Sequence, residues 1–293
     1  MQLLTPLHWQ EYELIDSGNF EKLERFGTHV LARPEPQAIW DKRLSETEWQ
    51  QLAQAVFKRD KNSPERGEWI LQKNTPEKWW LNYRHGGLNL SLKCSLTSFK
   101  HVGIFPEQAA NWDYLGQKLR QLPVPKPSVL NLFAYTGAAS VAARQTGADV
   151  THVDAVKQVV TWSRENMEAS NTDNIRWVVE DALKFVKREV KRGKTYNCLI
   201  LDPPAYGRGP EGEKWVLEEH LNELLKNCAQ LLDPAHFVFI INLYSMGFSA
   251  LIVENLVQNC FEKLPNAEFG ELYLADSAHK KLPLGVFYRF SSV

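Results

Sequence analysis

The stretch from Ser128 to Asp154 constrains the fold of this chain more than any other. An apolar run of strand length, Val129 to Phe133, ends in the turn Tyr135-Thr136-Gly137. A segment with helical period follows from Ala138 to Gln145, and a second short strand then ends on Asp154. This order predicts a β-turn-α-β unit, the building block of a parallel sheet.

The turn and the acid suggest a ligand. Gly137 lets a ligand approach the backbone at the carboxyl end of the strand, and Asp154 can accept both hydroxyls of a ribose. A dinucleotide site would need the three glycines of G-x-G-x-x-G, whereas F-A-Y-T-G-A-A-S holds one. S-adenosylmethionine, which has no phosphate, fits the turn better, although an ordinary turn of any doubly wound domain has the same pattern.

Length and composition exclude several classes of protein. A chain of 293 residues is about right for two domains, and its formal net charge of −1 gives no overall attraction to nucleic acid. The four cysteines lie far apart without a C-x-x-C pair, so we expect no metal site. No apolar run approaches the roughly 18 residues of a membrane span, and the N-terminal sequence lacks a signal peptide pattern, so we expect a cytoplasmic protein without a membrane segment.

The first part of the chain, residues 1–97, predicts a small β-rich domain. Short extended pieces between Glu13 and Trp40 are followed by a helical pattern from Glu46 to Arg59. Three strand-like segments come next, of which the last two are joined by the hairpin-type turn Arg84-His85-Gly86-Gly87. This domain is a candidate for substrate recognition.

Residues 98–293 alternate strands and helices and close with two strands, Phe269 to Leu274 and Val286 to Phe290. The pattern predicts an α/β fold: a Rossmann-like, mostly parallel, seven-stranded sheet with helices on both faces and an antiparallel end. Its order of strands, helices and turns matches a class I methyltransferase.

Polar residues follow four of the predicted strands, and in an open α/β sheet the ligand lies beyond these carboxyl ends. We expect the first turn to contact the methionine part of the cofactor, Asp154 its ribose and Asp181 its adenine amino group. The predicted cofactor-binding residues of these strand ends are Phe133, Tyr135, Thr136, Gly137, Asp154, Ala155, Glu180, Asp181, Ala182 and Asp202.

The most specific motif is D-P-P-A-Y, from Asp202 to Tyr206. Two prolines fix the backbone, so that the Asp202 carboxylate and the Pro203 carbonyl can accept hydrogen bonds from a planar nitrogen-bearing group. Tyr206 can stack on the ring of that group. We expect Asp202, Pro203 and Tyr206 to be the catalytic residues.

The motifs F-A-Y-T-G-A-A-S, E-D-A and D-P-P-A-Y together resemble the bacterial large-subunit ribosomal RNA methyltransferases. The segment V-G-I-F-P-E-Q is similar to a stretch that borders the cofactor pocket in that family, which implies cofactor-binding roles for Glu107 and Gln108. The resemblance implies RNA, and ribosomal RNA in particular, as the substrate. Members that methylate cytosine C5 carry a cysteine where this chain has Tyr244-Ser245-Met246, so direct transfer to a nucleobase nitrogen is expected.

The sequence leaves three other readings open. The same cofactor could serve a protein or small-molecule acceptor, the chain could be a dinucleotide-dependent oxidoreductase, or it could be a non-catalytic cofactor-binding module. The acceptor atom and the oligomeric state are not given by any motif.

Overall fold

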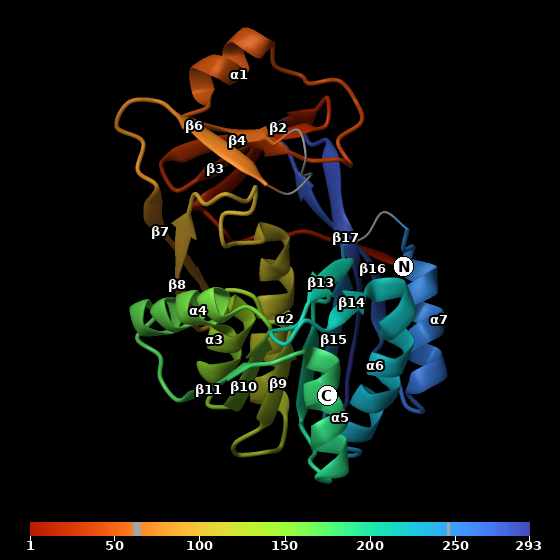
Figure 1. Cartoon of the computed structure of the whole chain (residues 1–293). Coiled ribbons are helices and arrows are strands. Elements are labelled where there is room, and N and C mark those ends of the chain that lie inside the picture. Colours follow the sequence, from red (N-terminus) through yellow and green to blue (C-terminus); the bar gives the residue numbers. More distant parts are fainter. Residues whose placement is uncertain (61–65, 245–246) are drawn as a thin grey trace.

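A computed structural model of the chain describes residues 1–60, 66–244 and 247–293. Its centre is an eight-stranded sheet, with all neighbours parallel except β17, which is antiparallel to both β15 and β16 (Figure 1). From one edge to the other the strands are β11 (Ile175–Val179), β10 (Asp149–Asp154), β9 (Ser128–Leu132), β12 (Cys198–Leu201), β15 (Val238–Leu243), β17 (Lys281–Ser291), β16 (Glu268–Ala275) and β1 (Gln2–Leu4). The predicted mostly parallel sheet with an antiparallel end is confirmed.

The eighth strand, β1, was not predicted, because three residues are too few to show an alternating pattern. It pairs in parallel with β16 at the edge of the sheet. The first residues of the chain therefore extend the main sheet, and the predicted division into 1–97 and 98–293 does not follow the sheets at this point.

Helices cover both faces of the main sheet. On one face lie α2 (Ala109–Gln121), α3 (Ala138–Arg144) and α4 (Lys157–Ala169); on the other lie α5 (Ala182–Lys191), α6 (Leu217–Leu231) and α7 (Ala250–Cys260). Alternate residues of the central strands supply the two cores: Val129 and Ile200 face the first set of helices, and Leu130 and Leu201 face the second. No helix in the described part of the chain is long and apolar enough to cross a membrane.

The β-rich character of the N-terminal part is confirmed. A five-stranded sheet holds β2 (Tyr12–Gly18), β3 (Glu21–Phe26), β4 (His29–Pro34), β5 (Ala55–Arg59) and β6 (Gly67–Leu71), with α1 (Glu46–Leu52) beside it. The strands β7 (Lys78–His85) and β8 (Leu88–Ser95) form the predicted hairpin.

Only the first half of the helix predicted from Glu46 to Arg59 is present. It begins as expected, since Ser45 and Glu48 form a capping box, but α1 ends at Leu52. The second half is β5, which pairs in parallel with β4 and antiparallel with β6. Strand pairing with distant residues overrides the helical spacing of a short apolar pattern.

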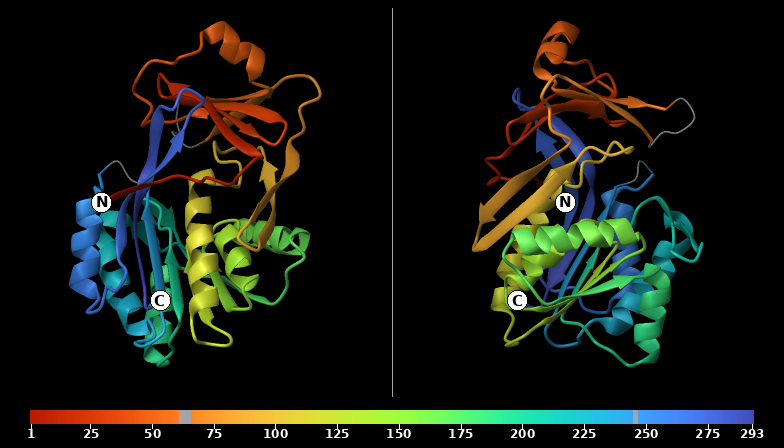
Figure 2. Two further views of the ribbon diagram at one scale, coloured as in Figure 1. Left: turned by 180° about the vertical axis from the view of Figure 1, so that it is seen from behind. Right: turned by 60° about the vertical axis from the view of Figure 1, so that its left-hand side comes forward.

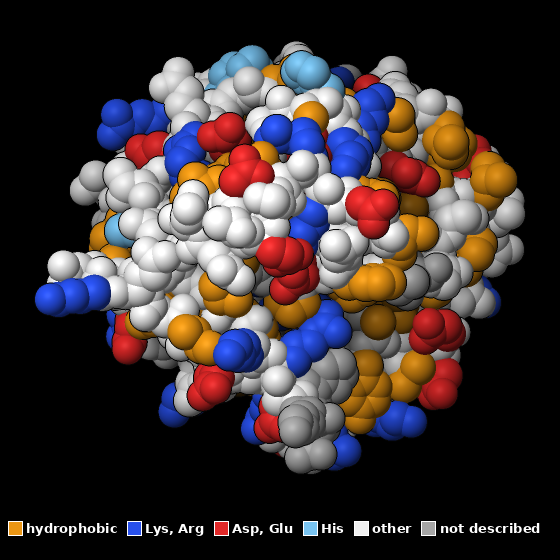
Figure 3. Space-filling view, turned by 90° about the horizontal axis from the view of Figure 1, so that it is seen from above, with side chains coloured by type: hydrophobic (Ala, Val, Ile, Leu, Met, Phe, Trp, Pro, Cys, Tyr) orange, Lys and Arg blue, Asp and Glu red, His pale blue; other side chains and the backbone are white. Residues whose placement is uncertain are grey.

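The N-terminal sheet lies over the carboxyl ends of the parallel strands (Figure 2). Ser277, in the loop between β16 and β17 of the main sheet, donates a hydrogen bond of 2.8 Å to the carbonyl of Ile15 in β2. The β7–β8 hairpin contacts a helix of the second part of the chain, since the backbone N–H of Lys93 in β8 donates a hydrogen bond of 2.8 Å to Asn166 in α4. Seen from above, basic and acidic side chains are interspersed over this part of the molecule (Figure 3).

Candidate functional site

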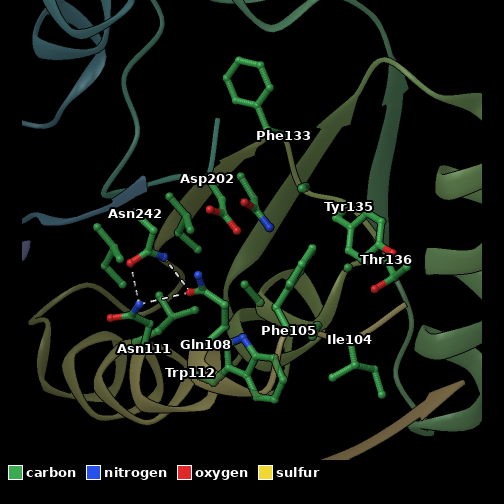
Figure 4. A pocket seen from close by; sticks show the side chains of 18 of the residues that line it. Ile104, Phe105, Gln108, Asn111, Trp112, Phe133, Tyr135, Thr136, Asp202 and Asn242 are labelled. Atoms are coloured by element: carbon green, nitrogen blue, oxygen red, sulfur yellow. Dashed lines mark hydrogen bonds between the residues drawn. The ribbon is translucent and has the colours of Figure 1, made fainter. Parts of the chain in front are cut away.

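A cavity opens at the carboxyl ends of β9, β12 and β15, against the first turn of α2 (Figure 4). Six of the residues predicted from the sequence line it together: Gln108, Phe133, Tyr135, Thr136, Gly137 and Asp202. Segments far apart in the chain therefore meet here, as the strand-end argument predicts.

The turn after β9 has an unusual backbone. Phe133, Tyr135 and Gly137 have φ angles of 53°, 48° and 84°, a left-handed conformation that costs energy for the two aromatic residues. A Cβ on Gly137 would meet Cβ of Ser163 in α4 at 2.9 Å, so close packing against α4 also requires glycine. The Thr136 hydroxyl donates to the carbonyl of Gly103 at 2.6 Å, which fixes the turn to the segment before α2.

Asp154 ends β10, as predicted, beside this turn. Its Oδ2 accepts a hydrogen bond from the backbone N–H of Tyr135 and its Oδ1 one from Val156, each of 2.9 Å. Burial raises the pKa of Asp154 and the two hydrogen bonds lower it, with burial the larger cause. Each carboxylate oxygen has a second lone pair, so the group can still accept hydroxyls from a ligand. Ala155, which follows it, is half-buried.

The predicted residues after β11 lie outside the cavity of Figure 4. Glu180 pairs with Arg188, while Oδ1 of Asp181 accepts a hydrogen bond of 2.8 Å from the N–H of Lys184 and so caps α5. Ala182 is buried in the first turn of that helix. Within the described residues, the second oxygen of Asp181 accepts no hydrogen bond.

The D-P-P-A-Y turn follows β12. Pro203 is buried, and the carbonyl of Pro204 accepts a hydrogen bond of 2.7 Å from the indole of Trp215. Tyr206 begins a short hairpin of β13 (Tyr206–Arg208) and β14 (Lys214–Val216), and its side chain is exposed. The contact with Trp215 thus fixes the backbone of the turn, while the Tyr206 side chain remains exposed to solvent.

The half-buried carboxyl group of Asp202, which lines the cavity, is influenced by the buried carboxyl group of Glu107. Glu107, in the short 3-10 helix Pro106–Gln108, is buried, and burial raises its pKa to about 7. Burial, followed by the charge of Glu107, raises the pKa of Asp202 to about 8. Near neutral pH both groups therefore titrate, as groups at functional sites often do.

Sequence reasoning missed a cluster of amides in the cavity. The Asn242 amide donates to Oε1 of Gln108 at 2.6 Å, and the Asn111 amide donates to Oδ1 of Asn242 at 3.0 Å (Figure 4). A signal existed in the sequence, because Asn242 interrupts the buried apolar run of β15. Asn111 is a buried polar residue of α2, one turn before Leu115, and only its contact with a strand 131 residues away identifies it.

A second buried polar chain lies under the turn. The Asn131 amide donates to the Ser140 hydroxyl at 2.9 Å, and this hydroxyl lies 3.0 Å from Nδ1 of His152. Burial lowers the pKa of His152 to about 3, so the ring is neutral at physiological pH. These contacts tie β9 and β10 to α3 and support the turn from inside.

Comparisons with known proteins agree with this geometry. A family model described as "Conserved hypothetical protein 95" matches residues 108–243. The crystal structure of a SAM-dependent methyltransferase from Agrobacterium tumefaciens is 35% identical in sequence and superposes with a TM-score of 0.91. The match covers 100% of this chain and 94% of the Agrobacterium chain. A putative methyltransferase, SMU.776, solved in complex with SAH, is 19% identical over 97% of this chain and 76% of its own, with a TM-score of 0.72, and shares the fold.

Curated relatives match about half of the chain. The ribosomal RNA large subunit methyltransferase K/L of Shewanella frigidimarina is 29% identical over 146 residues, which are 48% of this chain and 20% of that protein. The same protein of Shewanella oneidensis is 31% identical over 147 residues, 48% of this chain and 19% of its own. The chain spans about a fifth of the length of these relatives.

Proposed function

We propose a function for this chain from one premise: the chain belongs to the S-adenosylmethionine-dependent methyltransferases. It transfers a methyl group from S-adenosylmethionine to a nucleobase nitrogen of RNA, with ribosomal RNA as the expected substrate. The observation that carries the proposal is the position of Asp202-Pro203-Pro204, which follows the strand next to β9, so that Asp202 lines one cavity with the Tyr135-Thr136-Gly137 turn. Since RNA is the proposed substrate, we expect the protein to act in the cytoplasm.

The residues at the strand ends fit the cofactor. The Asp154 carboxylate has free lone pairs for two ribose hydroxyls, and the free oxygen of Asp181 can accept the adenine amino group, with Ala155 and Ala182 as apolar walls. We assign the methionine part to the turn after β9 together with Gln108, whose neighbours Asn111 and Asn242 fix its amide. Bound there, the cofactor supplies a methyl group activated by its sulfonium sulfur.

The chain's own residues then position the acceptor. The Asp202 carboxylate and the Pro203 carbonyl accept hydrogen bonds from an amino group of the base, and Tyr206 stacks on its ring. As the nitrogen is methylated it gains positive charge, which the nearby carboxylate stabilises. Because methyl transfer is an in-line displacement, such positioning supplies much of the acceleration.

The likeness of about half of the chain to ribosomal RNA methyltransferases supports RNA as the acceptor. The N-terminal sheet is proposed to help hold it, since this sheet lies over the carboxyl ends where the cavity opens.

The test is transfer of labelled methyl groups. Purified protein is incubated with tritiated S-adenosylmethionine and an extract of cells that lack the protein, and RNA is then separated from protein. We expect the label in RNA, with little label when the Asp202→Ala variant is used. Label that enters only protein or small molecules would refute the RNA substrate.

A further inference from the structure

Tyr244 lies two residues beyond Asn242, which lines the cavity, and is not itself one of the residues that line it. It directly follows β15, in which Ile241 pairs with Leu201 of β12. Asn242 therefore lies beside Asp202 at the ends of these two neighbouring strands. Side chains alternate along a strand, and Asn242 points into the cavity, so Tyr244, two residues further on, leaves the strand on the same face.

The two ends of the Tyr244 side chain have different surroundings. The residue is 39% exposed, yet its hydroxyl donates a hydrogen bond of 2.5 Å to Oε1 of Glu35, which is only 3% exposed. A partly exposed aromatic ring with a fixed hydroxyl is a rigid group, so little further entropy is lost when a planar group stacks on it.

Glu35 directly follows β4 of the N-terminal sheet, and buried charges hold it in place. Its Oε2 lies 3.1 Å from Nζ of Lys22, and Lys22 also lies 3.6 Å from Oε1 of Glu24, which pairs with Arg33 at 2.5 Å. All four side chains are almost fully buried. Such a set of paired charges is a costly way to stabilise a fold, but it fixes the position of the carboxylate that Tyr244 meets.

We propose that the Tyr244 ring is a wall of the acceptor site, on which the planar acceptor group stacks, and that Glu35 is a positioning residue that sets the ring from the N-terminal sheet. This inference rests on the proposed function. The strand order separates Tyr244 from the proposed ribose and adenine residues, which follow β10 and β11, because β12, which carries Asp202, and β9 lie between these strands and β15.

The test uses four single variants: Tyr244→Ala, Tyr244→Phe, Glu35→Gln and the control Tyr196→Phe. Tyr196 also donates its hydroxyl to a glutamate, Glu189 at 2.8 Å, but precedes the amino end of β12, opposite the cavity. Initial rates of labelled methyl transfer are measured against the concentration of total RNA from cells lacking the protein, and calorimetry gives the Kd for S-adenosylhomocysteine.

We expect Tyr244→Ala to raise KM for RNA about tenfold, the size of one lost base stacking contact, with the Kd for S-adenosylhomocysteine within about twofold of wild type. Tyr244→Phe and Glu35→Gln should raise KM less, and the double variant Glu35→Gln/Tyr244→Phe should equal the stronger single one, because both changes act through the one contact between these two side chains. Tyr196→Phe should leave KM unchanged.

Several results would overturn the inference: an unchanged KM in folded Tyr244→Ala, an equal loss of S-adenosylhomocysteine affinity, or additive effects in the double variant. If wild-type protein labels the protein fraction instead of RNA, the RNA substrate fails while the comparison of Tyr244→Ala with Tyr196→Phe, made on that fraction, still decides the role of Tyr244. Absence of label from every fraction would refute both the proposed methyl transfer and the proposed role of Tyr244.

Discussion

The backbone N–H of Tyr135 donates a hydrogen bond of 2.9 Å to Oδ2 of Asp154, so the turn after β9 and the acid at the end of β10 form one unit. The second oxygen of the same carboxylate accepts from Val156. A change at Asp154 therefore affects both the proposed ribose contact and the shape of the turn proposed to hold the methionine part.

We predict that Asp154→Ala weakens S-adenosylmethionine binding by about 1.5–3 kcal/mol, the usual size for hydrogen bonds to a charged group. Calorimetry gives the affinity, and circular dichroism checks the fold. The control is Asp149→Ala, at the other end of the same strand, where the exposed carboxylate pairs with Lys126 at 2.6 Å. Unchanged affinity in a correctly folded Asp154→Ala protein would remove the ribose assignment.

Asp181 has a structural role as well as a proposed one, and serine can separate them. We predict that Asp181→Ser keeps the N-cap of α5, because serine caps helices about as well as aspartate, and therefore keeps the melting temperature. Without a carboxylate for the adenine amino group, its affinity for S-adenosylhomocysteine should fall about tenfold, or about 1.4 kcal/mol. Wild-type affinity in this variant would show that adenine binds elsewhere.

The raised pKa values of Asp202 and Glu107 predict a pH dependence. Asp202 is protonated below a pH of about 8, and only its carboxylate can stabilise the developing positive charge, so kcat/KM should rise as the pH approaches about 8. Glu107→Gln removes the neighbouring charge that helps to raise the pKa of Asp202, so the rise should move to lower pH. A profile that stays in place or moves to higher pH in Glu107→Gln would contradict this coupling.

The raised pKa of Asp202 has the opposite effect on stability: activity should rise with pH, whereas the free energy of unfolding should fall. A carboxyl group whose pKa is higher in the folded than in the unfolded state favours folding at low pH, and this contribution is lost as the pH rises from about 4 to about 8. We therefore predict that Asp202→Asn loses less free energy of unfolding than wild type between pH 5 and pH 8, roughly the window set by the two pKa values. Urea unfolding at several pH values measures the difference, and parallel curves for the two proteins would count against a raised pKa.

Direct transfer predicts that no cysteine is needed. Cys94, Cys198 and Cys228 are buried and Cys260 is half-buried, and burial raises the pKa of all four thiols, which suppresses the thiolate. A folded protein with all four cysteines changed to alanine should keep its methyl transfer, while Asp202→Ala and Tyr206→Ala should lose most of theirs. The reverse result would indicate a covalent mechanism. Ser245 and Met246, where the related cytosine enzymes place their cysteine, lie outside the described residues.

The sequence predicted site residues correctly where one short segment contains both a strand and the residue that follows its carboxyl end. Gly137, Asp154 and Asp202 each follow an apolar run, so their meeting at one edge followed from the parallel sheet alone. Features that depend on long-range pairing were not predictable: β5 has the spacing of a helix, β1 is too short for any pattern, and Tyr244 meets Glu35 across 209 positions of the chain. Local periodicity contains no information about such partners.

The most direct test of the whole account is mass spectrometry of nucleosides from RNA that the purified protein has methylated. RNA from cells lacking the protein is incubated with protein and S-adenosylmethionine, with the Asp202→Ala variant in parallel, and digested to nucleosides. The account predicts one nucleoside with a new methyl group on a base nitrogen, absent when the Asp202→Ala variant is used. A new methyl group on carbon, such as C5 of cytidine, or no new methylated nucleoside at all, would contradict it.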